Sequence, residues 1–123
     1  MKMQESAENY LETIFILCKQ NSHVRSIDVA NHLGFTKPSV SVAMKSLREE
    51  GYVALDDDGS LTLTVKGEKI AKRVYERHQI IAKALIALGV DKDVAYIDSC
   101  KIEHDISDES FEKIKAHLKN FNI

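Results

Sequence analysis

The 123-residue sequence contains no run of about 18 consecutive apolar residues, the length that a helix needs to cross a membrane. Its first six residues include polar and acidic side chains where a signal peptide would need an apolar segment, so we expect a cytoplasmic protein with no membrane partner. Cysteine is scarce: without a secretion signal, Cys18 and Cys100 are expected to be reduced thiols rather than a disulfide. A chain this short also has no room for a second large catalytic domain.

An excess of positive charge is missing as well, since 17 Lys and Arg residues stand against 19 Asp and Glu residues, giving a net charge of −2. Taken alone, this balance argues against a nucleic-acid partner, because phosphate binding needs local positive potential. The charge is segregated, however: residues 66–83 are rich in Lys and Arg, whereas residues 91–112 are rich in Asp and Glu. The average charge therefore does not exclude DNA binding.

Apolar spacing and turn residues in the first half of the chain predict three helices followed by a β-hairpin. Ser6, Ser26 and Thr36 are expected to cap these helices, and Gly34 and Gly51 are expected to end the second and third. An acidic turn containing an Asp-Gly pair joins the two strands. The predicted elements are a helix over 6–19, a short helix from Ser26 to Gly34, a helix between Thr36 and Gly51, and strands over 52–55 and 61–64.

This order is that of a winged helix-turn-helix, which we assign to a DNA-binding domain over residues 1–65. The second half of the chain predicts only helices, and the apolar faces of the last two are too small for independent folding. We therefore expect a mainly α fold in which residues 66–123 form an all-helical, partner-facing domain. Its predicted elements are a long helix over about 66–88 between Thr64 and Gly89, a helix from Asp91 to Asp105 and a helix from Ser107 to Phe121.

The helix after Thr36 is the predicted DNA-reading element, because the second helix of a helix-turn-helix enters the major groove with its N-terminal end. Small hydroxyl groups can approach the DNA backbone, a lysine can reach a phosphate, and a helix N-terminus favours an anion. Considered one at a time, the same residues could equally be helix caps and a solvated charge. The candidates for contact with double-stranded DNA are Thr36, Lys37, Pro38, Ser39, Ser41, Val42 and Lys45, with Ser60 and Arg25 as further phosphate contacts.

A second candidate site lies near the C-terminus, where Cys100, Glu103 and His104 stand at positions i, i+3 and i+4 on one edge of a helix. Cys100 could instead be a small core residue, and the other two a solvated pair. Two further donors, Glu12 and His78, favour a metal site, and a thiolate with imidazole and carboxylate suits a first-row divalent ion rather than calcium or magnesium. The other histidines, at 23, 32 and 117, have no such neighbours and are expected at the surface.

Several motifs together resemble the diphtheria-toxin-repressor family of iron- and manganese-dependent transcriptional regulators over essentially the whole chain. They are E-N-Y-L-E-T-I-F from Glu8, T-K-P-S-V-S from Thr36, L-T-L-T-V-K-G from Leu61, the pair Arg77-His78, and C-K-I-E-H-D-I-S-D-E from Cys100. The resemblance implies a homodimer with an all-helical dimerisation domain. It implies binding to double-stranded operator DNA, control of metal-homeostasis genes, and activation by Fe(II) or Mn(II) bound between the two domains.

Carried over position by position, the resemblance implies the metal ligands Glu12, His78, Cys100, Glu103 and His104, with Asn9 where relatives hold an aspartate or a methionine. Glu12 and His78 are similar to the manganese-responsive branch and Cys100 to the iron-responsive branch, so analogy does not assign the metal. Ala82 and Tyr96 stand where some iron-responsive relatives place ancillary ligands, so that second site is expected to be absent. No extra C-terminal domain is expected after residue 123.

The expected mechanism is a metal cross-link that fixes the distance between two recognition helices, which reach successive major grooves only at a spacing of about 34–36 Å. Two other functions remain open at this point. One is a hydrolase that uses the cluster with an open coordination position, although no nucleophile motif accompanies it. The other is a winged-helix regulator that responds to a small organic ligand or to the redox state of the Cys100 thiol.

Overall fold

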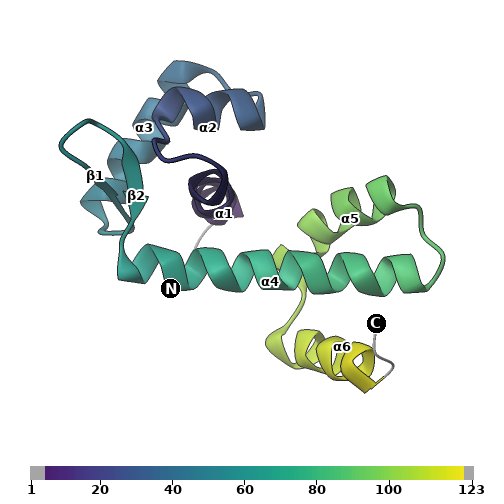
Figure 1. Ribbon diagram of the computed structural model, residues 1–123. Helices are drawn as coiled ribbons and strands as arrows, with labels where there is room; N and C mark the ends of the chain where they lie inside the picture. The colour runs from purple at the N-terminus through teal and green to yellow at the C-terminus, as the bar shows by residue number, and fades with distance from the viewer. Residues whose placement is uncertain (1–4, 121–123) are drawn as a thin grey trace. The chain divides into compact units, whose positions relative to one another are not determined.

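The computed structural model describes residues 5–120 and is mainly helical, with one two-stranded sheet in that part of the chain (Figure 1). One compact unit ends at Lys72 and a second begins at Arg73, and the long helix α4 belongs to both. No helix among residues 5–120 is long and apolar enough to span a membrane. The elements are α1 (Glu5–Gln20), α2 (Ser26–Leu33), α3 (Lys37–Glu49), β1 (Val53–Leu55), β2 (Leu61–Leu63), α4 (Val65–Ala87), α5 (Lys92–Asp105) and α6 (Asp108–Asn120).

The first unit is built around one apolar core to which α1, α2, α3 and the hairpin all contribute. On α3, Val40, Met44 and Leu47 recur at i, i+4 and i+7, so they line one side of the helix, and all three are buried. The opposite side of α3 is left exposed. Other core side chains of this unit are Leu11, Ile14, Val24, Val29, Val53 and Leu61.

The predicted caps are partly confirmed. Thr36 caps α3, since its Oγ1 accepts a hydrogen bond from the Ser39 backbone N–H at 3.4 Å, and Gly34 ends α2 with a left-handed φ of 73°. Two predicted caps are wrong. Ser6 lies inside α1, which already includes Glu5, and Ser26 is the first residue of α2, whose N-cap is Arg25. At α2 the Asp28 carboxylate accepts from the Arg25 backbone N–H at 2.9 Å, which fixes the helix start one residue before Ser26.

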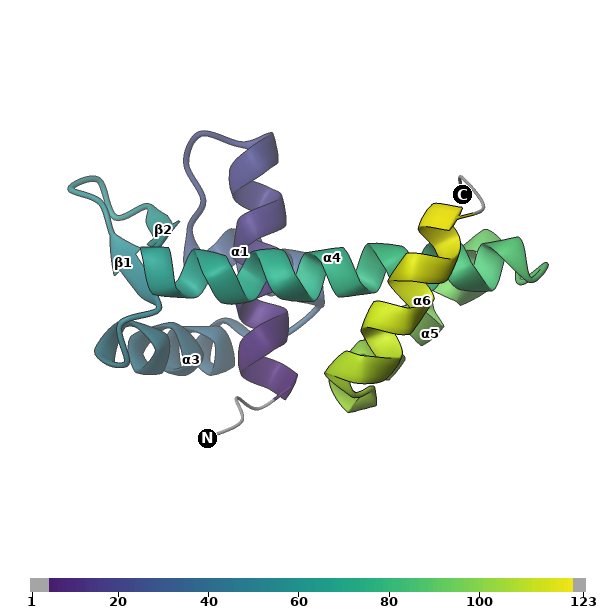
Figure 2. The same cartoon turned by 90° about the horizontal axis from the view of Figure 1, so that it is seen from below.

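The hairpin is antiparallel, with Val53 opposite Leu63 and Leu55 opposite Leu61, which confirms the predicted wing. The segment before α2 joins it, because the Leu61 backbone N–H donates to the Val24 carbonyl at 2.6 Å. After β2, Thr64 caps α4 as predicted by accepting from the Gly67 backbone N–H at 3.1 Å. Figures 1 and 2 both show the hairpin beside the start of α4.

In the second unit, α5 and α6 pack on the C-terminal part of α4 and follow the predicted order. Arg77 of α4 is buried: its guanidinium donates to the Asp108 carboxylate at 2.8 Å and to the Ile106 carbonyl at 2.6 Å, and it lies 5.1 Å from the centre of the Phe111 ring. These contacts fasten the start of α6 to α4. The last predicted helical residue, Phe121, lies outside the described residues. The domain boundary predicted at residue 65 stays a prediction, because α4 runs from Val65 through the division at Lys72 without a break.

Candidate nucleic-acid interface and metal centre

The exposed side of α3 carries the DNA-contact candidates. Lys37 is the first helical residue, and Thr36, which precedes it, is exposed. The side of α3 opposite its buried stripe therefore presents hydroxyl, ammonium and apolar groups to solvent. The remaining candidates on this exposed side are Pro38, Ser39, Ser41, Val42 and Lys45.

The two candidates outside the segment from Thr36 to Lys45, Ser60 and Arg25, differ from expectation. Ser60 is only 2% exposed, so we remove it from the residues proposed to touch DNA. Arg25 is exposed, but one Nη donates to the Asp58 carbonyl at 2.8 Å, so part of its guanidinium is occupied by the wing. Gly59 has a left-handed φ of 85°, and a Cβ there would lie 3.2 Å from the other Nη of Arg25. The turn of the wing thus accommodates the arginine.

A second contact between the same two segments joins His23 to Asp58, with Nδ1 and Oδ2 2.9 Å apart. We call His23, Arg25 and Asp58 the wing clamp. The Ser60 backbone N–H donates to Asp58 Oδ1 at 3.0 Å. That hydrogen bond first, then one from the Ser60 side chain and the charges of His23 and Arg25, lower the pKa of the Asp58 carboxyl. His23 is at the surface as predicted, but its role in the wing clamp was not foreseen, because its partner lies 35 positions away and no local spacing connects them.

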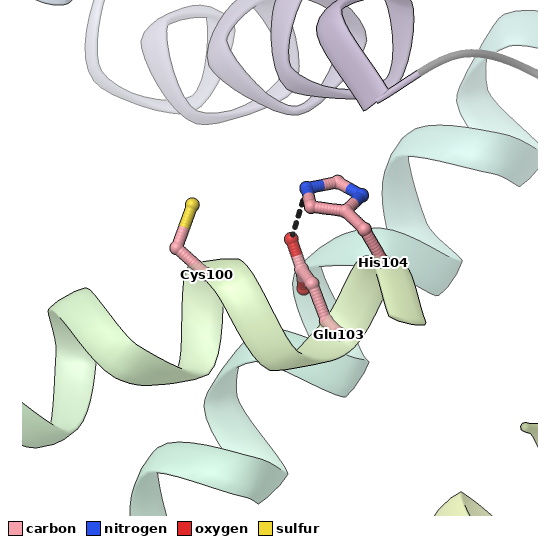
Figure 3. A group of neighbouring side chains, drawn as sticks. All are labelled: Cys100, Glu103 and His104. Atoms are coloured by element: carbon pink, nitrogen blue, oxygen red, sulfur yellow. Dashed lines mark ion pairs between the residues drawn. The ribbon is translucent and has the colours of Figure 1, made fainter. Parts of the chain in front are cut away.

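The candidate metal ligands of α5 lie together. Ligand atoms of Cys100, Glu103 and His104 all lie within 4.8 Å of one another, and the three side chains project from the same side of α5 (Figure 3). The Glu103 and His104 side chains are 1% and 4% exposed, with Oε1 3.4 Å from Nε2, whereas Cys100 is half-buried and is not part of a disulfide among the described residues. One helical turn therefore brings a sulfur, an oxygen and a nitrogen donor into one cluster, as the sequence predicts.

His78 of α4 is half-buried, and its Nε2 lies 3.0 Å from the Tyr96 carbonyl oxygen of α5. A carbonyl can only accept, so Nε2 carries the proton and Nδ1 is the basic nitrogen of the neutral ring. Metal-binding histidines are usually oriented by such a hydrogen bond through the second ring nitrogen. The orienting carbonyl belongs to the backbone, so nothing in the sequence points to it.

The remaining two candidates, Asn9 and Glu12, lie on α1 in the first unit. Asn9 is half-buried and Glu12 is 6% exposed. Ala82, at an ancillary ligand position of some iron-responsive relatives, is buried and offers no donor atom, and the Tyr96 hydroxyl donates to Gln79 Oε1 at 3.4 Å.

The donor set on α5 fits a divalent transition metal. Bonds of about 2.0–2.3 Å place ligand atoms on one ion no more than about 4.6 Å apart, close to the spread of the Cys100, Glu103 and His104 atoms. A thiolate and an imidazole favour first-row transition metals, and a buried carboxylate is stabilised by a cation.

Residues 2–61 match the N-terminal DNA-binding domain of the iron-dependent repressors, and residues 64–123 match the metal-binding and dimerisation domain of the same family. The chain belongs to the iron-dependent repressor family. An HTH-type transcriptional regulator of Methanocaldococcus jannaschii is 34% identical over 121 residues, which cover 97% of each protein. The HTH-type transcriptional regulator MntR of Bacillus subtilis is 34% identical over 116 residues, covering 94% of this chain and 82% of the relative.

Among solved structures, a manganese-dependent transcriptional repressor in complex with manganese matches with a TM-score of 0.84 and 27% identity. The match covers 92% of this chain and 52% of that one, so this chain spans about half the length of that structure. These findings confirm the resemblance inferred from the motifs and the winged-helix fold. The chain is a metal-dependent transcriptional regulator and not an enzyme, which removes the hydrolase interpretation.

The wing clamp generates a prediction about pH. Asp58→Asn should lower the stability of the metal-free protein at pH 7, because the contacts of the folded state stabilise the ionised carboxylate of Asp58. A lowered folded-state pKa means that this contribution is complete above the unfolded-state pKa of about 3.9 and is lost as the pH falls through the folded-state value. The difference in urea midpoint between wild type and Asp58→Asn should therefore shrink below about pH 4. Asp57→Asn, in the same exposed turn, is the control. An Asp58→Asn difference that does not vary with pH would contradict this account.

Proposed function

We propose that this protein is a homodimeric repressor that binds operator DNA when Fe(II) or Mn(II) occupies a site built on Cys100, Glu103 and His104. The observation that carries the proposal is the buried carboxylate and imidazole beside a thiol on one turn of α5. Burying such groups is costly unless a partner of opposite charge compensates. A divalent cation compensates the carboxylate and the thiolate at once.

His78 and Glu12 complete the proposed ligand set, with Asn9 as a weaker, neutral donor. His78 belongs to the same unit as the α5 ligands, and the hydrogen bond from its Nε2 to Tyr96 directs Nδ1 to the role of ligand. Glu12 is a buried carboxylate on a helix whose other buried residues are mostly apolar, as expected of a ligand rather than a solvated charge. The family resemblance supports both assignments.

The mixed donor set leaves two metals as candidates. A soft thiolate such as that of Cys100 favours the later first-row ions, whereas the carboxylates of Glu12 and Glu103 also suit Mn(II). Fe(II) satisfies both preferences, and the MntR relatives and the manganese-bound repressor structure support Mn(II). The ion would supply a cross-link between the unit that contains Glu12 and the unit that contains the α5 ligands.

DNA binding uses the exposed side of α3. Its N-terminal hydroxyls and Lys37 approach phosphates, and the residues further along the same side face base edges in the major groove. Two subunits bind together only when their α3 helices match successive grooves, about 34–36 Å apart. An ion bound to both Glu12 and the α5 residues would favour the conformation of the dimer in which the two α3 helices have that spacing. Metal binding would therefore increase the population of the DNA-binding conformation and raise operator affinity. Such a regulator acts in the cytoplasm, where it meets the chromosome and metal-homeostasis genes.

The contribution of the thiol is tested by Cys100→Ser. A hydroxyl replaces a soft thiolate, so affinity for Fe(II) and Co(II) should fall more than affinity for Mn(II), and metal-dependent DNA binding should weaken. Equilibrium dialysis under anaerobic conditions measures the order of affinities directly. Cys18→Ser, at the exposed second cysteine of the chain, is the matched control and should leave the order of metal affinities unchanged. An unchanged order in Cys100→Ser would show that Cys100 serves packing only.

The phosphate contact assigned to Lys37 is tested by Lys37→Ala. Removing one phosphate contact should lower affinity for all DNA sequences alike and make the slope of log affinity against log salt shallower by about one unit. Fluorescence anisotropy over a series of salt concentrations measures this slope. Lys92→Ala, at an exposed lysine of α5, should leave it unchanged. A loss confined to particular sequences would assign Lys37 to base readout.

The cross-link is tested by Glu12→Gln, which keeps the size of the side chain and removes its charge. The α5 ligands and His78 should still capture metal, although more weakly. A coupling free energy of about 1–3 kcal/mol corresponds to a ratio of about 5- to 150-fold between the operator affinities with and without metal. In Glu12→Gln this ratio should decrease much more than the affinity for metal does. Anaerobic titrations of metal and of DNA measure the two quantities. Glu5→Gln, exposed on the same helix, is the control. Full metal activation in Glu12→Gln would overturn the cross-link.

A further inference from the structure

The outer side of α3 contains an apolar residue where a polar one would be expected. Pro38, Val42 and Lys45 recur at i, i+4 and i+7, so they lie in one row, opposite the buried row that contains Val40. Val42 is 71% exposed, whereas Val40, two positions earlier, is 0% exposed. The outer row of α3 therefore begins with two apolar side chains and ends with a cation.

Because Val42 is 71% exposed, it gains little packing from this position in the free protein. A β-branched residue loses side-chain freedom in a helix, which lowers its helix propensity, and packing normally offsets that cost. Single exposed apolar residues are common and by themselves indicate little. What distinguishes Val42 is its place, one turn into the helix that the proposed function directs into the major groove, directly after exposed Ser41 and three positions after exposed Ser39.

In the major groove, the chemistry of Val42 selects one feature. A valine has no hydrogen-bond donor or acceptor, so it reads neither the amino groups nor the carbonyl and ring-nitrogen acceptors of the bases. Polar base groups in contact with the valine would lose their hydrogen bonds to water and gain no protein partner in exchange, which is unfavourable. The only apolar group on a base edge is the C5-methyl of thymine, which small apolar side chains contact. The two serines beside Val42 are short enough to allow a close approach of α3 to the bases.

We infer that Val42 is a specificity-determining residue that reads the C5-methyl of a thymine in each half-site of the operator. This inference rests on the proposed function and deepens it, because it names the base that the recognition helix requires. Lys45, one turn further along the same row, contributes a positive charge. A charged side chain does not recognise the thymine methyl group, so Lys45 does not distinguish A·T from T·A pairs in this way.

The test starts from DNA selected by the protein itself. A duplex library with a random core of roughly 30 base pairs, long enough for two half-sites one or two helical turns apart, is enriched on the full-length protein with Mn(II) or Fe(II) under anaerobic conditions. Each thymine of the enriched sequence is then replaced by deoxyuridine, which pairs identically and lacks only the methyl group. Affinities are measured by anisotropy for wild type, Val42→Ala and Val65→Ala. Val65 is the matched control, since it is a valine of the same unit with 74% exposure but lies outside α3.

We expect one thymine per half-site at which deoxyuridine lowers wild-type affinity by about three- to five-fold, the effect of one methyl group returned to water. The same replacement should have a clearly smaller effect on Val42→Ala, whose shorter side chain buries less of the methyl group, and an undiminished effect on Val65→Ala. Because Val42 is exposed, Val42→Ala should fold, and its circular dichroism spectrum and thermal midpoint check this. An equal deoxyuridine effect in wild type and Val42→Ala, or none at any thymine, overturns the role of Val42 and leaves the proposed function standing. Failure of metal to enrich any sequence overturns both.

Discussion

The burial of Glu103 beside His104 is the constraint on which the second unit depends. A carboxylate removed from water is destabilising unless cations or hydrogen-bond donors surround it, and a divalent ion compensates such burial strongly. Both side chains are almost fully covered. A fold that buries Glu103 and His104 one helical turn from the Cys100 thiol is stabilised when a divalent ion binds to them. Metal binding and the stability of α5 are therefore expected to be linked.

The first unit depends on a different constraint, the division of α3 into a buried and an exposed side. Val40, Met44 and Leu47 anchor the helix in the core, so its outer row has a fixed direction. The wing clamp fixes the hairpin in a similar way, since His23 and Arg25 hold Asp58 from the segment before α2. The wing tip is acidic and one of its charges is neutralised by this clamp. We therefore expect the wing to be placed by protein contacts and not by attraction to phosphate.

Features encoded within a few neighbouring residues could be predicted from the sequence. The cap at Thr36, the left-handed Gly34 and the cluster of Cys100, Glu103 and His104 each lie within one or two helical turns, where spacing determines geometry. Features that depend on distant partners could not be predicted. The burial of Ser60 follows from the position of β2 beside Val24, and the orientation of His78 from a carbonyl of α5. At α2 the local signal was ambiguous, because Ser26 and the pair of Arg25 with Asp28 compete for the same helix start.

The segregation of charge has a consequence for how the dimer selects its target. The exposed side of α3 offers two lysines, Lys37 and Lys45, whereas Asp56 and Asp57 of the wing are exposed and repel phosphate. Each phosphate contact contributes to non-specific binding, so a subunit with few contacts holds random DNA weakly. Specific binding must then come from base contacts made by two subunits at once, which requires the correct spacing. A regulator with few phosphate contacts is therefore more sensitive to a ligand that sets the spacing of its two recognition helices.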